Sequence, residues 1–301
     1  MGEFQTTGNS GREEDVNTDS PDFTLKLIQL FGGAGYSTVI LIRIIPNNWV
    51  LFSIFVEKKY FPDMVHASKI KVKSYMKMAD LIDANPNLLL MLQHFNIDFR
   101  VSDQTVMQLC TGYSISENLF VGIANLYNGL GPKAHPLFTR DDLVRVIEFL
   151  KQSHDYYRSD KYPQISSYIR QLQENHSAKE LKLLEKFFND YFAEVLEHLD
   201  YEDNIAFPYF IHLLKEKKSD SFRRELYSSI EYGEHHTDIE LKLKDLKQLL
   251  LKYVKIENDL DLRRRLFFAL YELEFDLYIH SLIEETILIP AGVSIEQEQD
   301  A

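Results

Sequence analysis

The pattern of apolar side chains divides the chain of 301 residues into segments of different secondary structure. Residues 38–45 and 49–56 are rich in β-branched and aromatic side chains, and a Pro-Asn-Asn turn separates the two runs, which predicts a β-hairpin. Residues 1–22 hold few apolar side chains, so burial cannot offset the entropy that they would lose on ordering. We therefore expect residues 1–22 to be disordered and residues 1–63 to form an N-terminal extension of uncertain role.

A membrane span is the competing interpretation of the two apolar runs, because together they are long enough to cross a bilayer. Arg43 and two asparagines would then lie near the middle of the bilayer, at a cost on the order of several kcal/mol. An acidic segment precedes the apolar runs, which argues against a signal peptide. The hairpin is the favoured prediction.

Short helices with one apolar face each are predicted between residues 64 and 130. The first begins at Asn85, with a proline in its first turn. The second begins at Ser102 or Asp103, and the third begins at Ser116. These helices predict a small N-terminal helical domain over residues 64–130.

Four long amphipathic helices are predicted between residues 137 and 292, and a short connecting helix is expected over residues 163–172. Pro208 is expected to bend or weaken the second long helix. The sequence thus predicts an all-α protein in which a four-helix bundle follows a small three-helix domain. The first, second and fourth long helices are expected to begin near Thr139, Ser177 and Asp259, and the third carries His236 to Val254 on one face.

Two of the long helices share a motif. In each copy a glutamate follows a histidine by four positions, and apolar residues and then a proline come after the glutamate. A spacing of four places the histidine and the glutamate on one helix face. The second copy lies 82 positions (280 − 198) after the first. The same offset relates four pairs of residues: His154 and His236, His198 and His280, Glu202 and Glu284, and Pro208 and Pro290.

The repeat predicts one polar layer of four histidines and two glutamates in an otherwise apolar bundle core. Burying two carboxylates among imidazoles without a cation would cost on the order of several kcal/mol in desolvation. A metal removes this conflict, since imidazole and carboxylate suit iron, zinc or manganese and two facing glutamates can each span a pair of ions. The predicted metal ligands are His154, His198, Glu202, His236, His280 and Glu284.

With these motifs, residues 140–290 resemble the hemerythrin-like domain in the variant of the repair-of-iron-centres (RIC) family. Residues 78–99 resemble the small N-terminal domain of the same family, although Arg100-Val101-Ser102 stand where that family has a cysteine pair and glycines. The resemblance implies an up-down four-helix bundle over residues 137–292. It also implies a carboxylate- and oxo-bridged di-iron centre that holds two iron ions with the six ligands named above.

The function implied by the resemblance is repair of iron-sulfur clusters damaged by oxidative or nitrosative stress, with the protein as a labile iron donor. The expected partners are damaged iron-sulfur proteins, with oxygen or nitric oxide as small ligands. A sensor of oxygen or nitric oxide that signals through the N-terminal helices stays open, as does a ferroxidase-like or nitric-oxide-reducing enzyme. Whether the centre is catalytic and whether the chain forms a homodimer are also left open.

The composition narrows the class of protein. A formal net charge of −13 disfavours binding to nucleic acid and to anionic membranes, so neither partner is expected. A basic stretch at residues 69–77 allows a DNA-binding interpretation, but a solvated charged face is favoured. Cys110 is the single cysteine, which permits no internal disulfide and fits a reducing compartment, so we expect the cytoplasm.

The remaining polar candidates are weaker. Glu240 lies one turn after His236 and is a candidate extra carboxylate, but the repeat gives it no counterpart. Tyr191 lies on the apolar face of the second long helix and is expected to be plain core. His235 and His212 are expected near the surface. His94, His135 and His176 have no assigned role.

Overall fold

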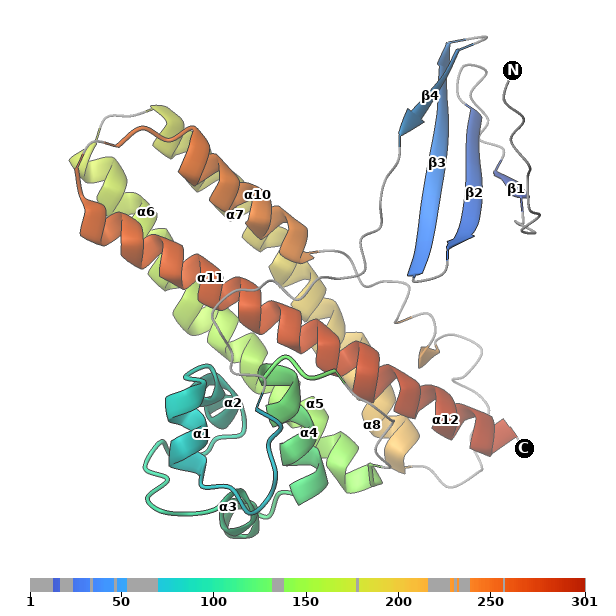
Figure 1. Cartoon of the computed structure of the whole chain (residues 1–301), viewed down its shortest axis with the longest axis vertical. Coiled ribbons are helices and arrows are strands. Elements are labelled where there is room, and N and C mark those ends of the chain that lie inside the picture. The colour runs from blue at the N-terminus through green and yellow to red at the C-terminus, as the bar shows by residue number, and fades with distance from the viewer. Residues whose placement is uncertain are drawn as a thin grey trace, which may run out of the picture. The chain divides into compact units, whose positions relative to one another are not determined.

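The computed structural model divides the chain into two compact units, Met1–Asp63 and Met64–Ala301. Of the first unit it describes only the backbone of four strands. Of the second unit it describes residues 70–131, 138–176, 179–215, 228–229, 232, 239–256 and 258–300, as drawn in colour in Figure 1.

The strands of the first unit form one antiparallel sheet in the order β1-β2-β3-β4. They are β1 (Glu13–Val16), β2 (Thr24–Gly32), β3 (Gly35–Ile45) and β4 (Asn48–Phe52). The predicted hairpin is present as β3 and β4, in which Ile40 pairs with Phe52. Four residues of the segment expected to be disordered form β1 instead, because an edge strand can satisfy its backbone by pairing with β2 without burying many side chains.

The described residues of the second unit are all-α, as predicted. None of their helices is both long enough and apolar enough to cross a membrane. The small N-terminal part, here called the module, contains four described helices rather than the three predicted. They are α1 (Met78–Ala84), α2 (Leu88–His94), α3 (Val106–Tyr113) and α4 (Glu117–Tyr127).

The side-chain caps at the helix starts explain which module helices could be predicted from the sequence. Ser116 accepts a hydrogen bond from the Leu119 backbone and begins α4 as predicted. Thr105, and not Ser102 or Asp103, caps α3 through a capping box, since Ser102 has a left-handed φ of 49°. The missed helix α1 spans two turns and has no side-chain cap at Lys77, so it gave no start signal.

Most described residues in the second part of this unit form four long helices, here called rods 1 to 4. Rods 1, 2 and 4 each contain a π-helical turn, and rod 3 is α10 (Ile239–Lys252). Rod 1 comprises α5 (Arg140–Tyr156), η1 (Tyr157–Lys161) and α6 (Tyr162–Asn175). Rod 2 comprises α7 (Lys179–Tyr201), η2 (Glu202–Ala206) and α8 (Phe207–Lys215). Rod 4 comprises α11 (Leu260–Ile283), η3 (Glu284–Leu288) and α12 (Ile289–Asp300).

A proline explains each π turn. Pro163, Pro208 and Pro290 each stand six positions after the first residue of their turn. A proline has no N–H to donate and its ring meets the carbonyl four positions earlier, so a wider turn just before it relieves the helix. The residue before the proline donates to the carbonyl five positions back: Tyr162 to Tyr157, Phe207 to Glu202, and Ile289 to Glu284.

These turns bear on two predictions. The irregularity expected at Pro208 is present as the π turn η2, and rod 2 continues beyond it to Lys215. The segment at residues 163–172 is no separate connector, because it belongs to α6, which extends rod 1 to Asn175.

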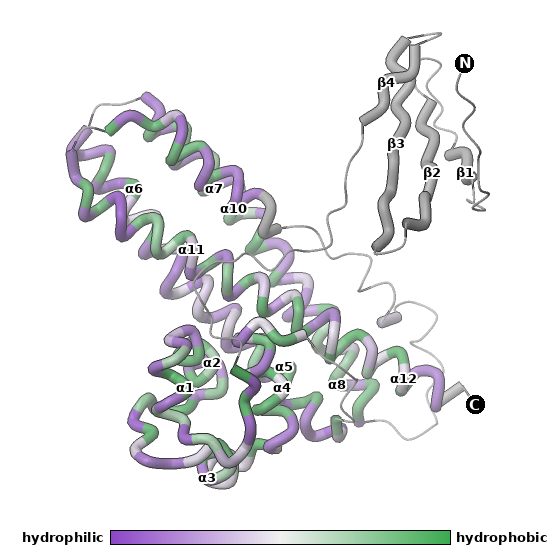
Figure 2. The backbone as a smooth tube through the Cα atoms, in the orientation of Figure 1, coloured by the Kyte–Doolittle hydropathy of each residue, from purple (hydrophilic) through white to green (hydrophobic). Residues whose placement is uncertain are grey.

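Rods 1 and 3 both pack against rods 2 and 4. α6 packs against α7 and α11, and α10 packs against the same two helices. Beyond the π turns, α8 packs against α5 and α12 (Figure 1). Hydrophobic and hydrophilic residues alternate along α6, α7 and α10, as expected for helices with one buried face (Figure 2).

Rod 4 is the central helix of the unit. All residues from Leu273 to His280 are buried, because α11 contacts α6 and α10 of the bundle and also α4 of the module. Module and bundle therefore share one core, although the sequence predicted them as separate domains.

A buried polar cluster joins the module to rod 4. Asp276 of α11 lies 2.8 Å from His94 Nε2 of α2 and accepts a hydrogen bond of 2.8 Å from the Tyr127 hydroxyl of α4. Burial opposes the charge of Asp276, but His94 and Tyr127 outweigh it and lower the pKa of this carboxyl. The junction is thus held by a carboxylate that stays ionised.

Replacing Asp276 should destabilise this junction. We expect Asp276→Asn to lower the free energy of unfolding by roughly 2–3 kcal/mol at pH 7, because hydrogen bonds to a buried charge are lost. The lowered pKa makes this contribution fully present above the unfolded-state pKa of about 3.9, and it disappears as the pH falls through the folded pKa. Urea unfolding between pH 3 and 7 would measure both effects.

The matched control is Asp190→Asn, which changes an exposed aspartate of α7. It should leave the free energy of unfolding within about 0.5 kcal/mol of the parent value. An equal loss for Asp276→Asn at pH 3 and at pH 7 would contradict the assigned ionisation.

Candidate metal centre

The two predicted glutamate ligands occupy equivalent places in their rods. Glu202 is the first residue of η2 and Glu284 is the first residue of η3. His198 and His280 each precede the glutamate by one helical turn. Both glutamate side chains are completely buried.

Three predicted ligands from three rods converge on one point. His154 Nε2 of rod 1 lies 3.1 Å from Glu202 Oε2 of rod 2 and 3.4 Å from His280 Nε2 of rod 4. The distance from His280 Nε2 to the same Glu202 oxygen is 3.7 Å. One ligand atom of each residue lies within 4.8 Å of the others, so His154, Glu202 and His280 could hold a metal ion together.

The second oxygen of Glu202 faces another histidine. His198 Nε2 lies 2.9 Å from Glu202 Oε1, whereas His154 approaches Oε2. Glu284 Oε1 in turn lies 3.2 Å from His280 Nε2. The two Glu202 oxygens thus point to different imidazoles, which is the arrangement that a carboxylate needs to join two ions.

The outer nitrogens of the two central histidines are already used. His154 Nδ1 lies 3.0 Å from Asp203 Oδ1, and a carboxylate only accepts, so this nitrogen carries the hydrogen. Ser153 donates its own hydroxyl to the Leu150 carbonyl, so its oxygen accepts from His280 Nδ1 at 2.8 Å. Both Nε2 atoms are therefore left to face the centre.

This hydrogen bonding fits a metal. Ligating imidazoles usually donate their outer N–H to a carboxylate, hydroxyl or carbonyl, which fixes the ring and leaves the inner nitrogen for the ion. Among the described residues, Glu202 Oε2 accepts no hydrogen bond although His154 Nε2 is close. Two imidazole nitrogens and a carboxylate oxygen thus face one point, where a metal ion could bind all three.

The charges of the buried carboxylates also favour binding of a cation. Burial opposes the charge of Glu202, but contacts with His154, His198 and His280 outweigh it and hold the pKa of this carboxyl well below its usual range. Burial likewise opposes the charge of His280, but Glu284 and Glu202 outweigh it and raise the pKa of this imidazole to about 10. In the metal-free protein a proton thus supplies the positive charge that the carboxylates require.

Asp203 connects the centre to the surface of rod 1. Its second oxygen accepts a hydrogen bond of 2.8 Å from Arg158, whose other nitrogen lies 2.9 Å from Asp200 Oδ1. Arg158 thereby fixes Asp203 in place, and Asp203 fixes the ring of His154.

The structure places five of the six predicted ligands around this centre. His236 and its neighbours His235 and Glu240 lie outside the residues whose side chains are described, as does His135. Tyr191 is buried in the bundle core, as predicted. His176 Nε2 lies 2.8 Å from Asp259 Oδ2, just before rod 4 begins, and is not part of the centre.

Tyr232 is a residue of the centre that the sequence did not reveal. Its hydroxyl lies 2.9 Å from Glu202 Oε1 and also contacts Glu284 Oε1. Burial and the two glutamates raise the pKa of this phenol well above its usual range. A single tyrosine among polar neighbours gives no signal of a metal site, and only its position four residues before His236 could have drawn attention to it.

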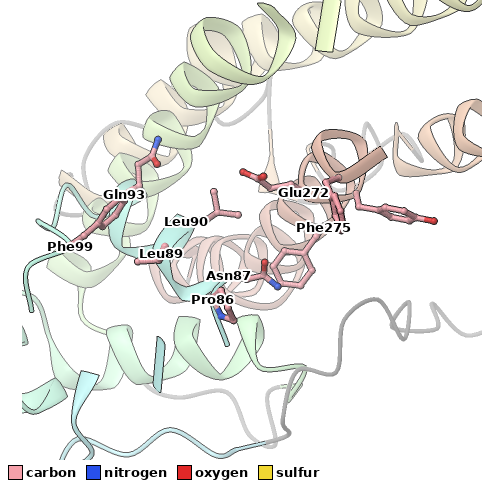
Figure 3. A pocket seen from close by; sticks show the side chains of 10 residues that line it. Pro86, Asn87, Leu89, Leu90, Gln93, Phe99, Glu272 and Phe275 are labelled. Carbon is pink, nitrogen blue, oxygen red and sulfur yellow. The ribbon is translucent and has the colours of Figure 1, made fainter. Parts of the chain in front are cut away.

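A cavity of about 700 Å³ lies elsewhere, between α2 and α11. Figure 3 shows Leu89 and Leu90 of the module on one side and Glu272 and Phe275 of rod 4 on the other. None of the residues that line it is a candidate ligand, so it is not part of the metal centre.

The chain matches no protein-family model, no curated protein and no solved structure. The assignment of the site therefore depends on the geometry of its own residues.

Removing the support of His154 should weaken metal binding without removing a ligand. We expect Asp203→Ala to lower the affinity for a divalent metal by about 10–100-fold, as is typical when the partner of a ligating histidine is lost. Competition with a coloured chelator would measure the affinity.

The matched control is Asp200→Ala, since Asp200 contacts Arg158 but not His154. It should change the affinity by much less than Asp203→Ala. Equal affinities for the parent protein and Asp203→Ala would show that the ring of His154 does not face a metal.

Proposed function

We propose that this protein holds a dinuclear iron centre and repairs iron-sulfur clusters damaged by oxidative or nitrosative stress, as a donor of labile iron. The observation that carries the proposal is the position of Glu202. Its two oxygens face His154 and His198 from within a fully buried side chain. Each oxygen, together with the histidine that it faces, could bind one ion, so Glu202 is placed to join two ions.

The donor atoms are compatible with iron. Imidazole and carboxylate ligands suit iron, zinc and manganese, and carboxylates from facing helices build di-iron sites in other helical bundles. No thiolate competes, because Cys110 belongs to the module helix α3. When bound, iron would supply Lewis-acid and one-electron redox chemistry to the centre.

Release of iron requires a route to solvent, and His198 provides it. The side chain of His198 is 13% exposed, whereas those of His154 and Glu202 are completely buried. A ligand at the edge of the centre can be exchanged for water without opening the bundle. We therefore expect iron to be exchanged on the side of His198.

Repair can be tested directly with a dehydratase whose iron-sulfur cluster has been damaged by nitric oxide. Iron-loaded protein should restore the activity of the damaged dehydratase, and restoration should require Glu202. Glu202→Gln keeps the size of the side chain but removes the charge that balances the ions, so it should lose iron and fail to restore activity.

Glu285→Gln serves as the control, because Glu285 is the exposed neighbour of Glu284. It should bind iron and restore the dehydratase as the parent protein does. Parent protein that holds iron but gives no more restoration than free ferrous iron at the same concentration would exclude the repair function.

A second candidate function is sensing of oxygen or nitric oxide through the N-terminal helices. The observation that favours it is the Asp276 cluster, which lies one helical turn before His280 and joins α11 to α2 and α4. The cavity between α2 and α11 leaves room for the module to shift. A displacement of rod 4 would thus reach the module directly.

Hydrogen exchange measures this coupling. On the sensor hypothesis, adding nitric oxide to the iron-loaded, reduced protein should change amide exchange in α2 and α4, and the change should shrink in His94→Gln. Exchange in these two helices that is identical with and without nitric oxide would rule out signalling through the module.

A further inference from the structure

Tyr232 occupies an unusual place between the two carboxylates of the centre. The residue is 1% exposed, and its hydroxyl contacts one oxygen of Glu202 and one oxygen of Glu284. A hydroxyl has one hydrogen, whereas an ionised carboxylate only accepts. The hydroxyl can therefore donate to one of these oxygens at a time, and the other contact joins two oxygens with no hydrogen between them.

The two oxygens that face Tyr232 are also the ones that face histidines. Glu202 Oε1 lies 2.9 Å from His198 Nε2, and Glu284 Oε1 lies 3.2 Å from His280 Nε2. The first metal position uses the other oxygen of Glu202, together with His154 and His280. Around Tyr232 there remains a second set of donor atoms: His198 Nε2, Glu202 Oε1, Glu284 Oε1 and Tyr232 Oη.

The backbone that carries Tyr232 is fastened to rod 4. Ser229 donates to Glu296 Oε1 from its backbone N–H at 2.9 Å and from its hydroxyl at 2.6 Å. The Tyr209 hydroxyl donates to the same oxygen at 2.5 Å. Gly292 lets the segment approach closely, since a Cβ there would lie 2.3 Å from the Ser229 hydroxyl. Next to this clamp, the backbone N–H of Tyr232 donates to the Ser228 carbonyl at 3.1 Å, and the ring of Tyr232 lies edge-on to that of Phe210.

We propose that Tyr232 is itself a metal ligand, which binds the second ion of the centre through its phenolate oxygen. The inference rests on the proposed dinuclear centre and adds an oxygen ligand to it. The phenol O–H bond breaks as the metal–oxygen bond forms, the proton leaves to solvent, and no electron is transferred. A cation in this position would balance the negative charge of the two carboxylate oxygens and the phenolate oxygen that meet there.

Ferric iron bound to a phenolate has a distinctive optical signature, so iron is the probe. The protein is loaded with ferrous iron without oxygen, then oxidised in air. The parent protein should show phenolate-to-iron charge-transfer absorption in the visible range, and excitation in that band should enhance tyrosine ring modes in the resonance Raman spectrum. Tyr232→Phe should lose both signals while it keeps more than half of the bound iron.

Tyr157→Phe is the matched control. Tyr157 is also fully buried and its ring centre lies 6.0 Å from that of His280, but no contact joins its hydroxyl to Glu202 or Glu284. This variant should keep the visible band and the ring modes. A band that survives in Tyr232→Phe or disappears in Tyr157→Phe would overturn the assignment to Tyr232.

Two further outcomes keep this inference separate from the proposed function. Parent protein that binds two iron ions per chain without tyrosine modes would overturn the inference and leave the dinuclear centre standing, whereas parent protein that binds no iron would overturn both.

If Tyr232→Phe does not hold iron, Gly292→Ala provides the test. It pushes Ser229 aside, so the band should shift in energy, and an unchanged band would contradict ligation by Tyr232.

Discussion

Two carboxylates buried in the middle of a helical bundle are the constraint on which the rest of this structure depends. The side chains of Glu202 and Glu284 have no exposed surface. Removing such charges from water costs on the order of several kcal/mol unless a cation balances them. The imidazoles of His154, His198 and His280 surround them, and the raised pKa of His280 shows how strongly the site attracts positive charge. Asp203 and Ser153 then hold the rings with their inner nitrogens toward the carboxylates.

The π turns connect this requirement to the sequence. In rods 2 and 4 the proline that forces the wider turn and the glutamate that begins it recur with the same spacing of six residues. π turns in other proteins often mark functional sites, because the extra residue reorients the side chains around it. Rod 1 repeats the turn with Tyr157 and Pro163 but places Ser153 and Tyr157 where the other rods have histidine and glutamate. The fold thus repeats a local structure and varies the chemistry that it carries.

The sequence revealed those parts of the centre that periodicity encodes. A histidine and a glutamate four positions apart on an apolar stripe predicted the convergence of His154, Glu202 and His280, and the structure brings these side chains together in a group able to hold a metal ion. The all-α class followed from the same stripes. The identity and number of the metals do not follow from them, since imidazole and carboxylate serve several metals. The role of Tyr232 and the pairing of His94 with Asp276, 182 positions apart, could not be predicted, because both depend on contacts between residues far apart in the sequence that no local pattern encodes.

The central claim is that one chain holds two iron ions joined by carboxylates, and the metal content of the iron-loaded protein tests it most directly. Elemental analysis combined with Mössbauer spectroscopy on the oxidised protein should give about two iron ions per chain with the magnetic coupling of a bridged pair. One metal ion per chain, or two iron ions without coupling, would contradict a centre in which Glu202 and Glu284 join both ions.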